Sequence, residues 1–177
     1  MIPNSLTMSA FGPYQNVVEI NFDIFKQDGL FLITGPTGAG KTMIFDAITF
    51  ALYGVSSGGE RSVEQFRCNS AKNDVATYVI LDFTLHNQRY VIKRSPKYTL
   101  EGRKTPKMPT ALLTLPNGKI IDGVKEVNTK VKELLGIDEK QFKQIAMIAQ
   151  GKFTELIYAG SDEREKVLRN LFKTDNL

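Results

Sequence analysis

The glycine-rich segment at residues 35–42 constrains the fold more than any other part of this sequence. It reads Gly-Pro-Thr-Gly-Ala-Gly-Lys-Thr and matches the pattern G-x-x-x-x-G-K-[ST] at every fixed position. A short apolar run, Leu-Phe-Leu-Ile at 30–33, precedes it, and apolar residues recur at helical spacing over 44–52. We therefore expect a central strand covered on both faces, then a loop, then a helix that ends at Gly54.

The residue types of this loop point to a bound phosphate chain. Glycines let the backbone approach phosphate closely, and the N–H groups at the start of a helix point at an anion. Lys41 is expected to neutralise the β- and γ-phosphates, and the Thr42 hydroxyl to coordinate Mg²⁺ shared with the nucleotide. The predicted nucleotide-binding residues are Gly35, Pro36, Thr37, Gly38, Ala39, Gly40, Lys41, Thr42 and Met43.

Strand patterns surround this loop and indicate a mixed α/β fold. Alternating apolar residues on both sides of short turns predict antiparallel hairpins over 6–22, 78–94 and 111–121. The stretch 95–110 holds three prolines and several cations, so we expect an irregular excursion there.

Helical patterns fill most of the remaining sequence. Apolar spacing predicts a helix over 124–135 that stops at Gly136. Asp138 is expected to cap the next helix, with Gln141 as its reciprocal partner. A last helix is expected from Ser161 to the end of the chain, with no stop signal.

Composition excludes several classes of protein. The chain has 177 residues, 42% of them apolar, which suits an ordinary globular domain. The single cysteine, Cys68, excludes an internal disulfide and indicates a reducing compartment, and the lone His86 is expected in a hairpin turn. No apolar run approaches the ~20 residues that span a bilayer, and no signal-peptide pattern is visible. We therefore predict a cytoplasmic protein without membrane contact.

Two segments imitate further parts of a nucleotide-hydrolysing site. Asp82 ends the apolar segment 78–81 as a metal-binding acid would, but Phe83 continues the alternation of a hairpin strand. Residues 57–60, Ser-Gly-Gly-Glu, resemble the signature loop of ABC-type ATPases, yet they follow directly on the predicted helix. We favour a strand residue for Asp82, and a flexible exit loop for 57–60.

Short motifs along nearly the whole chain match one family of ATPases. They are 12–14, 29–42, 44–48, 93–96, 123–128, 141–145, 150–151 and 164–165. On these residues the chain resembles the amino-terminal part of the SbcC family, in the SMC-like branch of ABC ATPases. The resemblance implies a P-loop NTPase fold, an ABC-type lobe I with antiparallel hairpins. Residues 1–160 would form the amino-terminal half of an ATPase head, and 161–177 the start of a coiled-coil helix, where the chain is cut.

The resemblance also implies residue roles and cofactors. Gln150 corresponds to the Q-loop glutamine, which reaches Mg²⁺ and its water. The implied catalytic residues are therefore Lys41 and Gln150, the metal ligands Thr42 and Gln150, and the cofactors ATP and Mg²⁺. Ala149, Lys152 and Met43 stand where the family usually has proline, glutamate and threonine.

The same resemblance implies partners and a cellular function. In the SbcC family the Walker B acid, signature loop and switch histidine belong to a carboxy-terminal half, so we expect this chain to bind ATP without turning it over alone. The implied partners are that half, an SbcD-like nuclease subunit, DNA ends or hairpins, and a second head in an ATP-bound dimer. The implied function is DNA double-strand break and hairpin processing in repair, recombination and replication. The alternative is a stand-alone P-loop phosphotransferase such as a small-molecule kinase, with lid arginines drawn from Arg61, Arg67, Arg103 and Arg164.

A cluster of cations is a candidate for contact with DNA. Its members are Lys93, Arg94, Lys97, Tyr98, Arg103, Lys104 and Lys107. Such a set can follow a phosphate backbone, with a strong dependence on salt. A solvated charged loop explains the same residues, because charge runs usually face water, and we favour that interpretation.

Overall fold

The computed structural model describes residues 1–25, 32–58, 62–146 and 160. It divides the chain into two compact units, Met1–Leu135 and Gly136–Leu177. The sequence-based boundary between 160 and 161 adjoins residues outside the description and stays a prediction, as does the coiled-coil helix over 161–177. Among the described residues, no helix has the length and apolar content needed to cross a bilayer.

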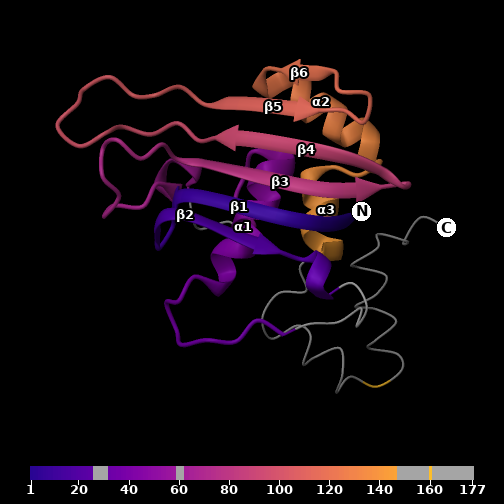
Figure 1. Ribbon diagram of the computed structural model, residues 1–177, viewed down its shortest axis with the longest axis horizontal. Coiled ribbons are helices and arrows are strands. Elements are labelled where there is room, and N and C mark those ends of the chain that lie inside the picture. The colour runs from indigo at the N-terminus through magenta and orange to yellow at the C-terminus, as the bar shows by residue number, and fades with distance from the viewer. Residues whose placement is uncertain (26–31, 59–61, 147–159, 161–177) are drawn as a thin grey trace. The chain divides into compact units, whose positions relative to one another are not determined.

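A six-stranded antiparallel sheet, in the order β2-β1-β3-β4-β5-β6, forms the first unit (Figure 1). The strands are β1 Ile2–Phe11, β2 Tyr14–Asn21, β3 Tyr78–Leu85, β4 Gln88–Ser95, β5 Thr110–Thr114 and β6 Ile120–Asp122. Consecutive strands pair as β1–β2, β3–β4 and β5–β6, which confirms the three predicted hairpins. The turn between β3 and β4 places His86 and Asn87 at positive φ, so His86 is a hairpin-turn residue as expected.

Three α-helices and two short 3-10 helices complete the described structure. They are α1 Lys41–Tyr53, α2 Val124–Leu135, α3 Glu139–Ala146, η1 Asp23–Phe25 and η2 Val63–Phe66. Helices α1 and α2 pack on the same face of the sheet and contact each other (Figure 1). That face carries the buried alternate residues of the central strands, such as Leu81 and Ile92, which lie opposite one another. The one-sided alternation in the sequence thus reflects a sheet with one covered face.

Caps end and begin the helices where the sequence predicted them. Gly54 adopts φ +74° and donates its N–H to the Phe50 carbonyl at 2.8 Å, which ends α1. In the second unit, the Asp138 N–H donates to Gln141 Oε1 and the Gln141 N–H to Asp138 Oδ1, both at 2.9 Å. This reciprocal pair confirms the predicted capping box before α3.

An aromatic cluster joins α1 to the sheet. Ala10 adopts φ +46° at a bulge in β1, and Phe11 follows it. The Phe11 ring lies 6.0 Å from Phe50 of α1 and 4.8 Å from Phe66 of η2, measured between centroids. The segment after η2 runs beside this bulge, since the Cys68 N–H donates to the Ala10 carbonyl at 2.9 Å. Cys68 is buried, as predicted.

The predicted covered strand at 30–33 is wrong in its described half. Leu32 and Ile33 have no regular secondary structure, and Leu32 is 85% exposed. A strand forms only beside another strand that satisfies its N–H and C=O groups. Within the described chain, no strand pairs with these residues. Residues 30 and 31 lie outside the description.

The excursion over 95–110 contains no strand before Thr110, as expected, but it is closed by one bridge. The Lys107 N–H donates to the Tyr98 carbonyl at 2.8 Å, and the Tyr98 N–H to the Lys107 carbonyl at 3.2 Å. Tyr98 and Leu100 are both buried. The excursion is therefore anchored near its base.

Candidate nucleotide-binding site

The loop at 35–40 leads directly into α1 and has the backbone of a phosphate-binding loop. Three glycines, Gly35, Gly38 and Gly40, adopt φ of +154°, +85° and +93°, which residues with a Cβ rarely reach. The Ala39 N–H donates to the Pro36 carbonyl at 3.2 Å and makes a tight turn. Residues 35–39 are all exposed, so a ligand can reach this turn at the positive end of the α1 dipole.

Lys41 closes over this loop. Its ammonium donates to the Gly35 carbonyl at 2.7 Å and to the Pro36 carbonyl at 2.8 Å. A phosphate oxygen is a stronger acceptor than a neutral carbonyl, because hydrogen bonds between charged groups are stronger than those to neutral partners. Thr42, the next residue, has an exposed side chain in the first turn of α1. The donors that the sequence predicted for a phosphate chain and Mg²⁺ thus lie together, and they fit both groups.

The turn between β1 and β2 supports the loop from the side. The Tyr14 hydroxyl donates to the Gly40 carbonyl at 3.3 Å, and burial raises the pKa of Tyr14. A Cβ on Gly40 would lie 2.7 Å from Pro13 Cγ and 2.8 Å from Tyr14 Oη. A Cβ on Gly12 would likewise lie 2.7 Å from Met43 Cε. Two close approaches therefore require glycine where this turn meets the loop and the start of α1.

Sequence reasoning assigned no role to this turn. The one signal for it was the Gly12-Pro13-Tyr14 motif within the resemblance, and that motif has no chemistry of its own to indicate a neighbour. The contact joins residues 26 positions apart in the case of Tyr14 and Gly40, so local patterns do not contain it. Met43 is buried against this turn, where it packs rather than faces the loop mouth.

Asp46 of α1 holds the segment that follows the helix. Its Oδ1 atom accepts the Ser57 N–H at 2.8 Å and the Ser57 hydroxyl at 2.5 Å, and Asp46 is buried. The Ser56 hydroxyl donates to the Gly58 carbonyl at 2.6 Å. The described part of 57–60 is therefore a loop tied to the helix it leaves, in line with the exit-loop interpretation.

Known protein families match the chain around this loop. The sequence profile of the AAA domain matches residues 5–176. The chain belongs to the AAA domain family. As an AAA domain with a mixed α/β fold, it has the P-loop NTPase character that the loop at 35–42 predicted.

Curated relatives of this AAA domain share one name, that of the SbcC component of the nuclease SbcCD. The protein from Vibrio cholerae is 41% identical over 98% of this chain and 18% of its own length. Those from Staphylococcus saprophyticus and Staphylococcus aureus are 35% and 34% identical, over 98% and 99% of this chain and 18% of their own lengths. The chain thus spans about a fifth of the length of these relatives, and the resemblance to the SbcC family is confirmed. A small-molecule kinase is not favoured.

Asp82 is a structural residue of this AAA domain. Its carboxylate accepts the Arg89 Nε–H at 2.8 Å and a second hydrogen bond from Arg89 Nη2, and it accepts the Asn4 Nδ2–H at 2.7 Å. These bonds join β3 to β4 and β1, and the contact with Asp82 raises the pKa of Arg89. The strand interpretation of Asp82 is therefore supported. Within the described residues, no three His, Cys, Asp or Glu side chains form a metal site.

Two members of the predicted DNA-contacting cluster are wrong. Arg94 is only 2% exposed, because alternation along β4 points Lys93 to solvent and Arg94 toward the helices. Tyr98 is 5% exposed, and its ring lies 4.9 Å from the Arg67 guanidinium. Its hydroxyl accepts the Thr77 N–H at 3.3 Å. Neither side chain can reach a nucleic acid.

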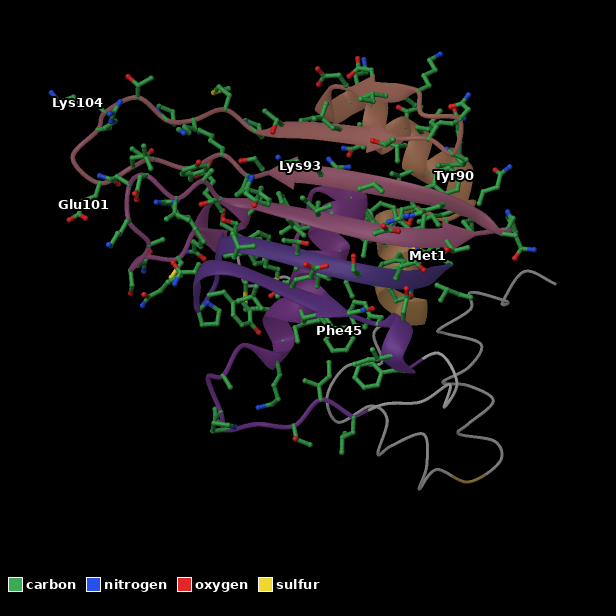
Figure 2. All side chains as sticks on the ribbon, viewed as in Figure 1. Met1, Phe45, Tyr90, Lys93, Glu101 and Lys104 are labelled. Carbon is green, nitrogen blue, oxygen red and sulfur yellow. The ribbon has the colours of Figure 1, made fainter. Side chains whose placement is uncertain are left out.

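The other cations of the cluster stay on or near the surface. Figure 2 shows Lys104 at the outer end of the excursion, and Lys93 on β4. Lys97 forms an ion pair with Glu64 at 3.1 Å. Two further cations, Arg103 and Lys107, belong to the same excursion, and Lys107 contributes its ammonium 5.9 Å from the Tyr98 ring. The cluster is thus a charged loop with a smaller accessible set than the sequence suggested.

Gln150, Ala149 and Lys152 lie outside the described residues, as do Arg61 and Arg164. The Q-loop assignment therefore stays a prediction. Arg67, a candidate lid arginine, donates to the Thr77 hydroxyl at 2.6 Å and to the Val75 carbonyl at 2.9 Å. It serves to hold the loop before β3.

Proposed function

We propose that this chain is the ATP-binding amino-terminal part of an SbcC-like ATPase subunit. The observation that carries the proposal is the exposed loop at 35–40 with the Lys41 ammonium closed over two of its carbonyls. The triphosphate of ATP would replace those carbonyls as the partner of Lys41 and accept the N–H groups at the start of α1. The match to SbcC proteins over 98% of the chain supports ATP as the ligand.

In this proposal each predicted site residue has one task. The residues from Gly35 to Met43 form the cradle and the first turn of α1, and Lys41 stabilises negative charge on the β- and γ-phosphates. Thr42 and Gln150 hold Mg²⁺, which when bound bridges phosphate oxygens and neutralises developing charge. Lys41 and Gln150 are the catalytic residues of the complete site.

The apolar surface near the loop supports a partner for this chain. Leu32, Ile24, Phe45 and Val17 are large apolar residues with exposed side chains, and Figure 2 shows Phe45 projecting from α1 below the sheet. Exposed apolar surface beside an edge strand, here β2, usually marks an interface. We propose that the carboxy-terminal half of the same protein covers it and supplies the Walker B acid and the signature loop. The chain alone would then bind ATP without sustained hydrolysis.

The wider function follows from this assignment. Residues 1–160 would be half of an ATPase head and 161–177 the start of a coiled coil. Two complete heads would dimerise around ATP in the cytoplasm and drive an SbcD-like nuclease subunit on DNA ends and hairpins during repair and recombination. Lys93, Arg103 and Lys104 are the cations best placed to meet a DNA backbone.

Calorimetric titration with ATP and Mg²⁺, together with a phosphate-release assay, tests the ATP proposal. We expect saturable binding by the chain and no sustained release of phosphate. Absence of binding would contradict the ATP proposal, and sustained turnover would contradict the half-site proposal.

Gel-shift titration tests the DNA surface separately. Charge reversal at Lys93, Arg103 and Lys104 should weaken binding to duplex ends, and the wild-type affinity should fall steeply with salt. A charge-reversed protein with unchanged affinity would remove this surface from the proposal.

A further inference from the structure

Arg94 of β4 is a buried cation in a place where the predicted chemistry does not need one. It is 2% exposed and faces the helices rather than solvent. Burial lowers the pKa of Arg94 to about 10, so the guanidinium stays charged at neutral pH. Burying a charge is costly unless hydrogen bonds satisfy it, so its partners indicate what it is for.

All of its partners among the described residues are neutral oxygens. Arg94 Nε donates to the Ala51 carbonyl at 2.7 Å, and Nη2 donates to the Leu52 carbonyl at 3.0 Å. Nη2 also donates to Asn128 Oδ1 of α2 at 2.6 Å. The planar fork of an arginine can serve three such acceptors at once, which an ammonium on a flexible stem cannot do in the same geometry.

Two of these acceptors are the end of the P-loop helix. Ala51 and Leu52 belong to the last turn of α1, whose carbonyls carry the negative end of the helix dipole. A Cβ on Gly54, the residue that ends the helix, would lie 3.2 Å from Arg94 Nη1. The helix end and the guanidinium are therefore fitted closely to each other.

The third acceptor extends the contact to α2. Asn128 lies on the helix that immediately precedes Gly136 and the second unit of the chain. Arg94 and Asn128 both belong to segments that the sequence singled out, 93–96 and 123–128, without a role for either. One side chain thus ties a sheet strand, the P-loop helix and α2 together.

We propose that Arg94 is a positioning residue for nucleotide binding, which fixes the carboxyl end of α1 and thereby the place of the phosphate-binding loop at its other end. The inference rests on the proposed ATP function. A helix of this length is a stiff rod of roughly 20 Å, so a tilt at Ala51 and Leu52 moves the first turn at Lys41 and Thr42. The loop contacts to Tyr14 and Pro13 would then be made from a displaced position.

A purely structural role for Arg94 makes a different prediction. In that case its replacement lowers the melting temperature, but chains that are still folded bind ATP as before. The positioning role requires weaker binding by folded chains. Measurements well below the melting temperature of each variant separate the two.

The test uses Arg94→Lys, with Arg89→Lys as the matched control on the same strand, where the side chain is 74% exposed. Titration calorimetry with ATP and Mg²⁺ gives the affinity, and amide hydrogen exchange reports on residues 41–44. For Arg94→Lys we expect about tenfold weaker ATP binding, within the usual range of coupling between sites, and faster exchange at 41–44. For Arg89→Lys both should match the wild type.

Asn128→Ala carries the same test if Arg94→Lys does not fold, because it removes one acceptor and leaves the two helix bonds. We expect about threefold weaker binding from it. Combining Arg94→Lys with Asn128→Asp gives the ammonium a carboxylate partner, and we expect it to recover part of the lost affinity.

The outcomes distinguish the inference from the function on which it rests. ATP affinities equal to wild type in Arg94→Lys and Asn128→Ala would overturn the positioning role. Failure of the wild-type chain to bind ATP would instead overturn the proposed function. In that event hydrogen exchange without nucleotide still decides the inference, because unchanged exchange at 41–44 in Arg94→Lys contradicts it.

Discussion

The two ends of α1 solve the same local problem in opposite ways. At each end a cation donates to two backbone carbonyls, Lys41 to those of Gly35 and Pro36, and Arg94 to those of Ala51 and Leu52. The Lys41 contacts are on the exposed side of the loop, whereas the Arg94 contacts are buried. A point charge on a flexible stem at the surface can change partners, and a buried fork cannot.

The helix dipole gives this difference a direction. A cation at the carboxyl end of a helix is favourable, whereas Lys41 stands at the amino end, where a positive charge is unfavourable until an anion joins it. A phosphate therefore gains most at the open end of α1. The closed end teaches that a helix which presents such a site is anchored where it is least accessible.

Removing the cation of the open end should have the largest effect. Lys41→Ala should weaken ATP binding by about 3 kcal/mol, because a hydrogen-bonded ion pair with the phosphates is lost. The melting temperature should change little, since the contacts of Lys41 are exposed. Calorimetry with ATP and Mg²⁺ measures the affinity, with Lys119→Ala in the exposed β5–β6 turn as the control. Equal affinities for both variants would remove the contrast between the two ends.

Adding one methyl group to the loop should have the next largest effect. Gly40→Ala places a Cβ against Pro13 and Tyr14 at φ +93°, and we expect a loss of about 2 kcal/mol in unfolding free energy. Gly38→Ala is the matched control, because its φ of +85° is similar but no atom lies within 4 Å of the added Cβ. Urea unfolding measures both. If the two losses are equal, the support from the β1–β2 turn contributes nothing.

At the closed end a glycine substitution should cost less. Gly54→Ala should lower the unfolding free energy by about 1 kcal/mol from its φ of +74°, with a small addition from the contact with Arg94. Gly136→Ala, at φ +70° with open space around it, measures the backbone part alone. We expect Gly54→Ala also to weaken ATP binding slightly and Gly136→Ala to leave it unchanged. The opposite order would break the proposed link between Arg94 and the loop.

A substitution away from both ends should leave ATP binding unchanged. Asp82→Ala removes the acceptor of Arg89 and Asn4, so the melting temperature should fall. The affinity for ATP and its dependence on Mg²⁺ should match the wild type in calorimetry. A changed Mg²⁺ dependence would restore Asp82 as a metal-binding acid.

Local patterns predicted those elements whose information is local. The αL glycine at 54, the capping box of Asp138 and Gln141, and the hairpin turn at His86 all depend on residues a few positions apart. The loop at 35–42 was readable for the same reason, since its glycines and its lysine are consecutive. The strand predicted at 30–33 failed at Leu32 and Ile33, because a strand needs a neighbour that the local sequence does not contain.

By itself, the sequence determined where the chain turns, where its helices begin and end, and which loop can accept a phosphate. Only the tertiary structure decided that Tyr14 meets Gly40, that Arg94 is buried at the end of α1, and that Tyr98 is covered. The physical reason is distance along the chain. Arg94 lies 43 residues from Ala51, so its charge suggested a surface role until the pairing of strands and the packing of α1 placed it in the core.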